Sequence, residues 1–406
     1  MQALRPILGG KARKMVEDKN ASFFEVKSNQ PAKDIASKRP FWIHAASGEI
    51  EYARPVIREL KNKYPQTPII VTFSSPSAKK ILKTLIDVDA WGALPWDFQK
   101  NCEQFLETWK PRCLLIARTD VWPVMAEACH QKGIPSLLFS ATFASNSSRL
   151  KGLSAEVTRW ALSQLSEIFC VSTEDVRQLD RLGLQVPVHV HGDTRFDQVF
   201  HRLAHPKVIK NELRPSKASP VLVAGSTWPE DEKVLLPAFA QVKTRCKMVL
   251  APHEINEGHM QPLEAELKAL GLTYCKYSKA SSWQSEDVLI IDEIGVLAEL
   301  YTWGDFAFVG GSFKKQVHSV MEPLAAGLPV IVGPFHHNNR EALLFKEKTL
   351  IGQFVVTEVT DITAMKVELT KLIEKMPQGF SDSLRQELSQ HRHSSQYVVE
   401  WCEKHL

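Results

Sequence analysis

Short apolar runs alternate with longer segments of helical periodicity along most of this chain, and this alternation constrains the fold more than any other feature. In the first half the apolar runs cover residues 41–46, 68–73, 113–117, 135–139, 167–171 and 186–190. Each run is followed by a polar turn and then by a segment typical of a helix. This order is typical of successive βα units, which form a parallel sheet covered by helices on both faces.

The pattern breaks at residues 201–219, which contain Pro206, Pro215 and many charges, and then restarts with runs at 221–224, 247–251, 288–291, 306–309 and 329–332. A chain of 406 residues is long enough for two cores. We therefore predict an α/β fold of two Rossmann-like lobes, at 41–200 and 220–380, joined by a connector at 201–219. Residues 381–406 are expected to form a C-terminal helix. The two parallel sheets are expected to face an interlobe cleft with the carboxyl ends of their strands.

Charge is concentrated at the N-terminus. Nine basic residues face four acids within residues 1–40, whereas the whole chain carries a formal charge of only +4. Nucleic acid is therefore not expected as a partner. This basic leader, with its apolar residues Leu4, Ile7 and Leu8, is interpreted either as a solvated, partly disordered arm or as a segment that contacts anionic lipid headgroups.

No apolar stretch is long enough to cross a bilayer, and no signal peptide follows the first methionine. We therefore expect no transmembrane anchor. The seven cysteines form no C-x-x-C pair, which favours a reducing, cytoplasmic location. Contact with a membrane would then be peripheral.

The first candidate functional segment is His44-Ala45-Ala46-Ser47-Gly48-Glu49. A buried strand is predicted to end there, and Glu49 opens the helix that follows. A carboxylate at the carboxyl edge of a parallel sheet can act as a base. It can equally serve only to complement the positive end of its helix. The residues alone leave both interpretations open.

The second candidate is the turn Gly225-Ser226-Thr227, which follows a predicted strand and precedes a helix with acidic residues at 230–232. Backbone N–H groups and hydroxyls at such a turn suit a nucleotide phosphate. An ordinary helix N-cap explains the same residues.

The third candidate lies between residues 310 and 322. Gly310, Gly311 and Ser312 follow a predicted buried strand, and glycines allow close approach of a ligand to the backbone. Lys314, Lys315 and His318 supply positive charge or hydrogen-bond donors. Glu322 opens a helix and can accept hydrogen bonds from ribose hydroxyls. The order is that of a nucleotide-binding segment.

These segments belong to a longer series of motifs that resembles the 3-deoxy-D-manno-octulosonic acid (Kdo) transferases of lipopolysaccharide biosynthesis, which have the two-lobed GT-B architecture. The motifs occur in order over about residues 41–345: HAASGE, DVWP, GDTRFD, AGST, APHE, DEIG, and DFAFVGGS through HSVMEPLAAGLPVIVGP. The resemblance implies an inverting glycosyltransferase. Its donor would be CMP-Kdo and its acceptor a lipid A precursor at a membrane surface.

The resemblance also implies roles for individual residues. Glu49 matches the general base, and Ser47, Gly48, Arg118 and Asp120 lie on the acceptor side. The residues that match or flank the nucleotide-sugar segments are Ser226, Thr227, His253, Glu254, Ile294, Gly295, Gly311, Ser312, Lys314, His318 and Glu322. No cofactor is expected, and no metal, since the sequence lacks an obvious D-x-D motif at a strand end.

Several features depart from the family pattern. We expect no counterpart of the usual hydrophobic anchor helix, and the base motif is one residue shorter between Ser and Gly. Arg118-Thr119-Asp120 stands where many members have Glu-Thr-Glu, and Ser140-Ala141-Thr142 replaces a common Asn-Ala-Arg. Two other hypotheses remain open: a UDP-sugar 2-epimerase of the same shape, and a non-catalytic protein that binds nucleotide sugars.

Overall fold

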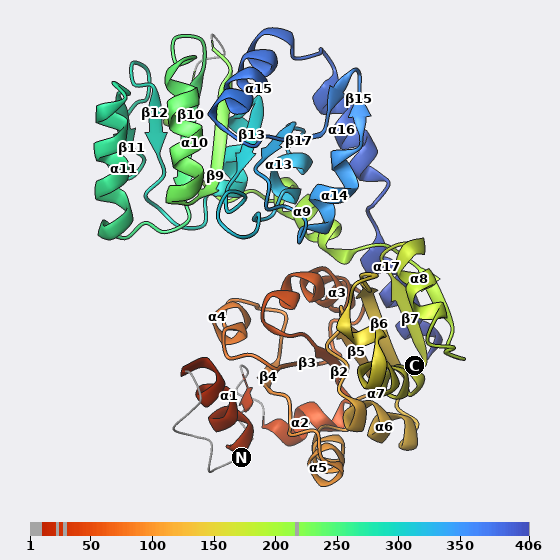
Figure 1. The fold of residues 1–406 in the computed structure, drawn as a ribbon. Helices are drawn as coiled ribbons and strands as arrows, with labels where there is room; N and C mark the ends of the chain where they lie inside the picture. Colours follow the sequence, from red (N-terminus) through yellow and green to blue (C-terminus); the bar gives the residue numbers. More distant parts are fainter. Residues whose placement is uncertain (1–9, 22–23, 27–30, 216–218, 406) are drawn as a thin grey trace. The chain divides into compact units, whose positions relative to one another are not determined.

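The computed structural model describes residues 10–21, 24–26, 31–215 and 219–405. The side chains of residues 10–13 and 47 are outside this description. The chain divides into an N-terminal unit, Met1–Gln198 with His391–Leu406, and a C-terminal unit, Val199–Gln390. Each unit is built around one large, mainly parallel sheet, as the alternation of apolar runs predicts (Figure 1).

The sheet of the N-terminal unit has the strand order β1-β4-β3-β2-β5-β6-β7-β8. All neighbouring strands are parallel except β1, which is antiparallel to β4. The strands are β1 (Phe24–Val26), β2 (Phe41–His44), β3 (Ile69–Phe73), β4 (Ala90–Ala93), β5 (Cys113–Ala117), β6 (Ser136–Ala141), β7 (Glu167–Cys170) and β8 (Val188–Val190).

Alternate side chains of this sheet enter two separate cores. Phe41 and Ile43 of β2 pack with the helix α3 on one face, whereas Trp42 packs with α2, α5 and α6 on the other. Burial on both faces explains why the strands read as continuous apolar runs. The helices are α1 (Gly10–Asn20), α2 (Ala32–Ser37), α3 (Ile50–Lys63), α4 (Ala78–Leu82), α5 (Gln99–Trp109), α6 (Pro123–Gln131), α7 (Gly152–Ser163), α8 (Thr173–Asp180) and α9 (Thr194–Ala204), with the short 3-10 helices η2 (Ser47–Glu49) and η3 (Ser148–Leu150).

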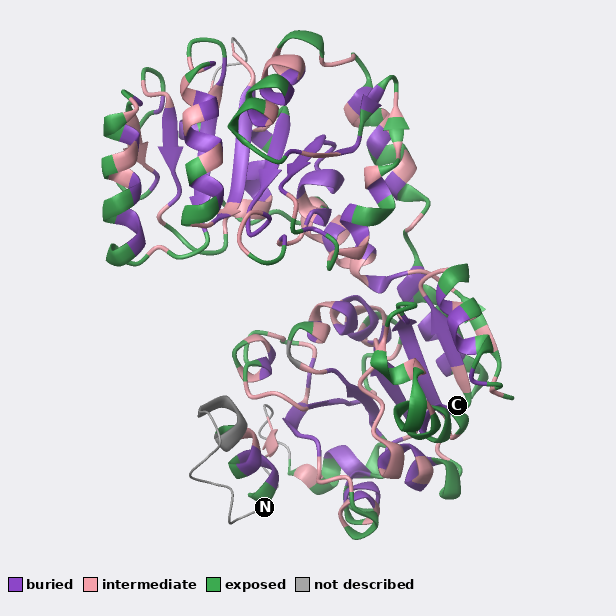
Figure 2. Cartoon of the chain, viewed as in Figure 1, coloured by how far each residue is buried: buried purple, intermediate pink, exposed green. Residues whose placement is uncertain are grey.

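The sheet of the C-terminal unit has the order β11-β12-β10-β9-β13-β14-β17, and all of its neighbouring strands are parallel. The strands are β9 (Val221–Thr227), β10 (Lys247–Pro252), β11 (Tyr274–Lys276), β12 (Val288–Ile290), β13 (Phe306–Val309), β14 (Val330–Val332) and β17 (Val356–Glu358); β15 (Thr349–Leu350) and β16 (Gln353–Phe354) form a separate hairpin. In Figure 2 the buried strands run between helices that are exposed on one side only.

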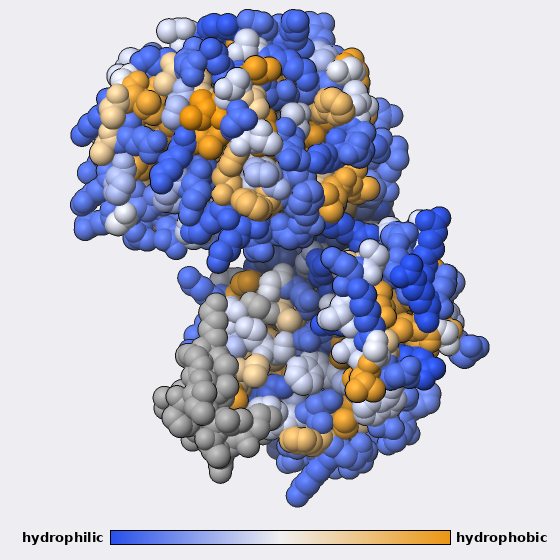
Figure 3. Space-filling view, in the orientation of Figure 1, coloured by the Kyte–Doolittle hydropathy of each residue, from blue (hydrophilic) through white to orange (hydrophobic). Residues whose placement is uncertain are grey.

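The helices of this unit follow the strands in βα order. They are α10 (Pro229–Ala240), α11 (Glu257–Ala269), α12 (Leu297–Leu300), α13 (Met321–Ala325), α14 (Arg340–Lys346), α15 (Ile362–Lys375) and α16 (Phe380–Ser389), with η4 (Asn211–Leu213) and η5 (Tyr301–Trp303). Three of them, α10, α11 and α15, pack on the sheet and form one core with it. Figure 3 shows hydrophilic side chains over most of the visible face of this unit, with separate apolar patches between them. Surface apolarity therefore does not single out a functional site there.

Two terminal segments differ from the prediction. Residues 381–406 contain two helices rather than one, because α16 packs in the C-terminal unit while α17 (Ser394–Lys404) returns to the N-terminal unit. There Val398, Val399 and Trp401 of α17 complete the core over β2.

The described part of the basic leader packs on the N-terminal sheet and is not a solvated arm. Strand β1 pairs with β4, and Lys19 of α1 is only 3% exposed. Its ammonium lies 4.2 Å from the ring centre of Trp122 and 5.0 Å from that of Trp96, which compensates part of the cost of burial. Leu4, Ile7 and Leu8 lie outside the described residues. Among the described helices, none is long and apolar enough to span a membrane.

Candidate functional site

Each sheet contains one point where the strand order reverses, and most of the predicted site residues follow the strands at these two points. In the N-terminal sheet β2 lies between β3 and β5, and in the C-terminal sheet β9 lies between β10 and β13. The connections after the two central strands leave in opposite directions at such a point, which opens a crevice at the carboxyl ends of the strands. Glu49 follows β2 and Arg118 follows β5. Ser226 is the last but one residue of β9, and Gly311 follows β13.

Glu49 ends the short helix η2 and immediately precedes α3. Its Oε2 accepts a hydrogen bond from the backbone N–H of Ala46, at 3.2 Å. Burial raises the pKa of Glu49, and the charge of Asp120 raises it further, whereas His44 and Arg118 oppose this shift. Gly48 is exposed, and a side chain there would meet nothing within 4 Å. The side chain of Ser47 lies outside the described residues.

A chain of hydrogen bonds lowers the pKa of Asp120, whereas the pKa of Glu49 is raised. The indole N–H of Trp42 donates to the Thr72 hydroxyl at 2.8 Å, and that hydroxyl lies 3.0 Å from Nδ1 of His44. With the Thr72 O–H directed to Nδ1, the Nε2–H of His44 donates to Oδ2 of Asp120, also at 3.0 Å.

Ser74 donates to the same Asp120 oxygen at 2.7 Å. Burial alone would raise the pKa of Asp120, but the bonds from His44 and Ser74 hold it well below its usual range. The environments of Glu49 and Asp120 thus push two neighbouring carboxyl pKa values apart. This pattern is typical of acid–base sites, in which one carboxyl group accepts a proton and the other stays charged.

Arg118 brings a guanidinium into the same site. Its backbone is left-handed, with φ of 66°, and its side chain donates to the hydroxyl of Tyr52 and, at 3.0 Å, to that of Thr142. This positive charge favours the ionised form of Glu49. The N-terminal cluster therefore joins a carboxyl group of raised pKa, a carboxylate of lowered pKa and a guanidinium at one sheet edge.

In the C-terminal unit, the ends of β9 and β13 touch through glycine. Gly310 N–H donates to the Gly225 carbonyl at 2.9 Å, and a Cβ added at Gly310 would lie 2.3 Å from the carbonyl oxygen of Ser226. Any larger residue at 310 would separate the two loops. Ser226 itself has a positive φ of 55°. The sequence analysis expected a ligand to approach the backbone here, whereas at Gly310 the structure shows the backbone of Ser226 and Thr227 in that place.

Four of the predicted nucleotide-sugar residues line one cavity of about 240 Å³ in the C-terminal unit: Ser226, Gly295, His318 and Glu322. Ser226 lies in β9, Gly295 between β12 and α12, His318 in the segment after β13, and Glu322 in α13. Sequence analysis assigned no role to the other lining residues, which are Arg202, Leu297, Ala298, Tyr301 and Ser319. Of these, Arg202 belongs to the end of α9, and no sequence motif marked it.

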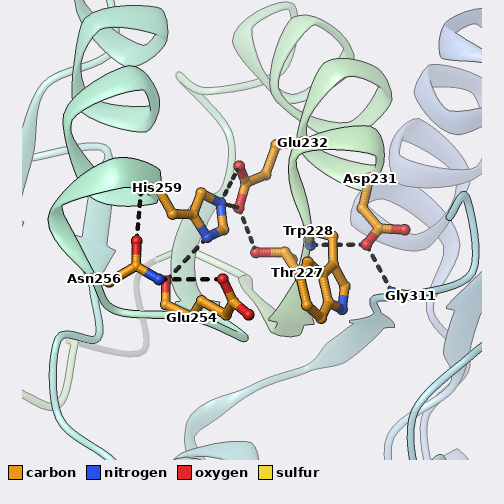
Figure 4. A network of polar contacts seen from close by, with 8 residues as sticks. All are labelled: Thr227, Trp228, Asp231, Glu232, Glu254, Asn256, His259 and Gly311. Carbon is orange, nitrogen blue, oxygen red and sulfur yellow. Dashed lines mark hydrogen bonds and ion pairs between the residues drawn. The ribbon is translucent and has the colours of Figure 1, made fainter. Parts of the chain in front are cut away.

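Asp231 of α10 holds the glycine turn through hydrogen bonds to its backbone (Figure 4). Its carboxylate accepts backbone N–H bonds from Trp228 at 2.9 Å, Gly311 at 2.7 Å and Phe313 at 2.9 Å. The N–H of Gly311 is therefore engaged within the protein. Ser312 is likewise buried, and its hydroxyl donates to the Val309 carbonyl at 2.9 Å. Gly311 and Ser312 therefore stabilise the turn through hydrogen bonds within the protein.

A second buried network in Figure 4 involves Thr227, Glu232 and His259. Nδ1 of His259 lies 3.0 Å from the Glu254 carbonyl, and this nitrogen must be protonated because a carbonyl only accepts. Nε2 lies 2.9 Å from Oε2 of Glu232, so a proton is also needed between these atoms. The Thr227 hydroxyl donates to Oε1 of Glu232 at 2.8 Å. Burial raises the pKa of Glu232, against the hydrogen bonds from His259 and Thr227.

His318 faces a compact set of aromatic rings. The indole N–H of Trp228 donates to its Nε2 at 3.0 Å, which places the His318 proton on Nδ1. His253 stacks on both rings, with centroids 4.6 Å from Trp228 and 4.3 Å from His318. Burial, with the nearby His253, lowers the pKa of His318 to about 4. His318 is therefore a neutral hydrogen-bond donor at pH 7.

Lys314 provides the nearby cation that the sequence predicted. Its Nζ lies 3.4 Å from the centre of the Trp228 ring. Glu254 is exposed, and its side chain accepts a bond from Asn256 at 3.1 Å, while its carbonyl holds His259. Ile294 is 87% exposed. In the described part of the chain, no group of three or more His, Cys, Asp or Glu residues has an arrangement that could hold a metal ion.

Comparison with known proteins agrees with this architecture. Residues 19–198 match the family described as 3-Deoxy-D-manno-octulosonic-acid transferase (kdotransferase). The chain is 29% identical to the 3-deoxy-D-manno-octulosonic acid transferase of Bordetella pertussis over 75% of this chain and 73% of that protein. It is also 29% identical to the enzyme of the same name from Aquifex aeolicus (strain VF5), over 83% of this chain and 90% of the relative.

Solved structures bear on the fold alone. A UDP-GlcNAc 2-epimerase from Neisseria meningitidis superposes with a TM-score of 0.64 at 16% identity, covering 90% of this chain and 99% of the epimerase. The prediction of a GT-B type α/β fold is thereby confirmed. The chain is thus similar over most of its length to 3-deoxy-D-manno-octulosonic acid transferases, a family of glycosyltransferases, and residues 19–198 match that family's model.

Proposed function

We propose that this protein transfers Kdo, or a closely related ulosonic acid, from its CMP-linked donor to a lipid A precursor with inversion at the anomeric carbon. The observation that carries the proposal is the pairing of Glu49, whose pKa is raised, with Asp120, whose pKa is lowered, at the switch point of the N-terminal sheet. A base whose pKa lies closer to neutrality accepts a proton more effectively during bond formation.

In the proposed reaction, an acceptor hydroxyl attacks the anomeric carbon on the face opposite the phosphate. The new C–O bond forms as the bond to the phosphate oxygen breaks, and CMP leaves with the electron pair. The hydroxyl proton passes to Glu49. Arg118 helps to keep this carboxyl group ionised before the reaction.

The C-terminal cavity supports the nucleotide part of the proposal. Ser226, Gly295, His318 and Glu322 offer a hydroxyl, a main-chain loop, a neutral imidazole donor and a carboxylate around one hollow. Charge on the leaving phosphate rises as the bond breaks, and one fixed donor at such a position is typically worth about 2.7 to 4 kcal/mol. Lys314 adds a cation beside Trp228. The proposed mechanism uses no cofactor or metal.

A lipid acceptor implies peripheral contact with a membrane, which we propose to be the cytoplasmic face of the inner membrane. Lys14, Lys33, Lys38 and Arg39 of the leader are exposed and can approach anionic headgroups. Salt-sensitive sedimentation with anionic vesicles tests this contact.

The decisive assay is mass-spectrometric detection of transfer from CMP-Kdo to a lipid A precursor, with Glu49→Gln as the matched variant. We expect product with the unchanged chain and a loss of about 10²- to 10⁴-fold for Glu49→Gln, the range that general-base catalysis contributes. Calorimetric binding of CMP should be the same in both. No product from the unchanged chain, or full activity of Glu49→Gln, would refute the proposal. Tighter binding of UDP than of CMP would favour an epimerase.

A further inference from the structure

The loop at Ile294 and Gly295 is held by the segment that links the two units. Arg202, near the end of α9, donates to the Gly295 carbonyl at 3.2 Å, and Nζ of Lys207 donates to the same oxygen at 3.1 Å. Gly295 has a positive φ of 94°, and a Cβ added there would lie 3.3 Å from Nζ of Lys207. Two cations thus converge on one carbonyl of a loop that presents the exposed side chain of Ile294.

Glu299 fixes the direction from which these cations approach. Its side chain is 3% exposed and accepts two hydrogen bonds from the Arg202 guanidinium, at 3.1 and 3.0 Å. The backbone N–H of Lys207 approaches the same carboxylate at 3.4 Å. Burial would raise the pKa of Glu299, but its bonds to Arg202 lower it. A bidentate pair of this kind restricts the orientation of Arg202.

Arg202 borders two hollows. One is the nucleotide-side cavity described above, and the other has a volume of about 180 Å³ and is lined by residues such as Leu203, Pro206 and Ile209. Glu322 also lines both. With open volume on two sides, the position of Arg202 is determined by its polar bonds to Glu299 and Gly295.

The contact also orients the next peptide group. A trans peptide is planar, so its C=O and N–H point in opposite directions. When the Gly295 carbonyl points to Lys207 and Arg202, the N–H of Val296 points the other way. The two cations therefore determine which main-chain groups the loop presents on its outer side.

We propose that Lys207 and Arg202 are positioning residues that hold the loop of Ile294 and Gly295 in the conformation that binds the nucleotide. The proposal rests on the proposed function, because that function assigns the loop to the nucleotide. The two residues act through the Gly295 carbonyl and need not touch the nucleotide. Substrate affinity is thereby linked to the conformation of the connecting segment.

Lys207→Met tests this role, with Lys207→Arg as the conservative variant and Arg214→Met as the control. Arg214 lies on the same segment and donates to the Thr302 carbonyl at 3.3 Å, so its loss removes one cation and one carbonyl contact without touching Gly295. Hydrogen–deuterium exchange of residues 293–297 reports the loop without any ligand. Calorimetry with CMP and UDP reports nucleotide binding.

We expect faster exchange at 293–297 in Lys207→Met only, and nucleotide binding weakened by about three- to tenfold, the loss expected for one partly exposed charged hydrogen bond. Lys207→Arg should restore both. Equal exchange in Lys207→Met and Arg214→Met, or unchanged affinity, would overturn the proposal. If the unchanged chain binds UDP and not CMP, the proposed donor is wrong, while the exchange comparison and UDP affinity still decide the role of Lys207.

Discussion

Replacing Glu232 separates the effect of its hydrogen bonds from the effect of its charge. In the folded protein its two oxygens accept from the Thr227 hydroxyl and face Nε2 of His259. In Glu232→Gln, the amide oxygen can still accept from Thr227, and the amide N–H can donate to a neutral His259. In Glu232→Leu, a side chain of similar volume offers neither contact.

The burial of its two partners determines how much each Glu232 variant should lose in the free energy of unfolding. Thr227 is fully buried and the side chain of His259 is 7% exposed, so water cannot replace a lost partner at the first and barely can at the second. An orphaned buried group costs about 1 to 3 kcal/mol, which predicts a loss of about 2 to 5 kcal/mol in the free energy of unfolding for Glu232→Leu. Glu232→Gln keeps both bonds and should lose about 1 kcal/mol or less.

Urea unfolding of the two variants and the unchanged chain, followed by circular dichroism, measures these differences. Hydrogen exchange in α10 and α11 identifies which unit is affected, because both partners lie in the C-terminal unit. If Glu232→Gln destabilised the protein as much as Glu232→Leu, an ion pair rather than hydrogen bonding would be responsible. If neither variant lost stability, the network of Figure 4 would have no energetic role.

Two further predictions concern the ends of β5 and β13. Arg118→Met removes a charge that lowers the pKa of Glu49, so the rise of kcat/KM with pH, as Glu49 loses its proton, should move to higher pH; a pH–rate profile that stays in place or moves down would contradict this. Gly310→Ala should destabilise the protein by about 1 to 3 kcal/mol in urea unfolding, because its Cβ would lie 2.3 Å from the Ser226 carbonyl oxygen. A neutral result would show that the two loops separate easily.

The strands were predictable where apolar residues are dense and the flanking turns are clear. The runs at 113–117 and 306–309 coincide with β5 and β13. Strand β4, with the sequence AWGA, was missed because it is short and has no β-branched residue. The division of the last two helices between units also could not be read from the sequence, because it depends on which distant core each helix completes.

The sequence allowed us to predict at which strand ends the candidate site lies. It did not allow us to predict the hydrogen bonds that join these strand ends. The acids at 230–232 have the pattern of a helix N-terminus, and Asp231 does accept the N–H of Trp228 there. Its bonds to Gly311 and Phe313, however, join residues 80 and 82 positions apart. Local sequence carries no signal for such contacts. The same is true of Arg202, whose contribution depends on the path of the connecting segment.

The two departures at 118 and 142 are connected in space. The resemblance predicts an acid at 118 and an arginine at 142, whereas this chain has Arg118 and Thr142. The structure places the Arg118 guanidinium 3.0 Å from the Thr142 hydroxyl. A guanidinium therefore lies at the end of β6, as in the family pattern, but it belongs to the residue after β5 instead of to residue 142. Relative to the family pattern, this chain lacks the acidic side chain at position 118. The surroundings of Glu49 are therefore more positive than the family pattern implies, and the charge of Arg118 favours the ionised form of Glu49.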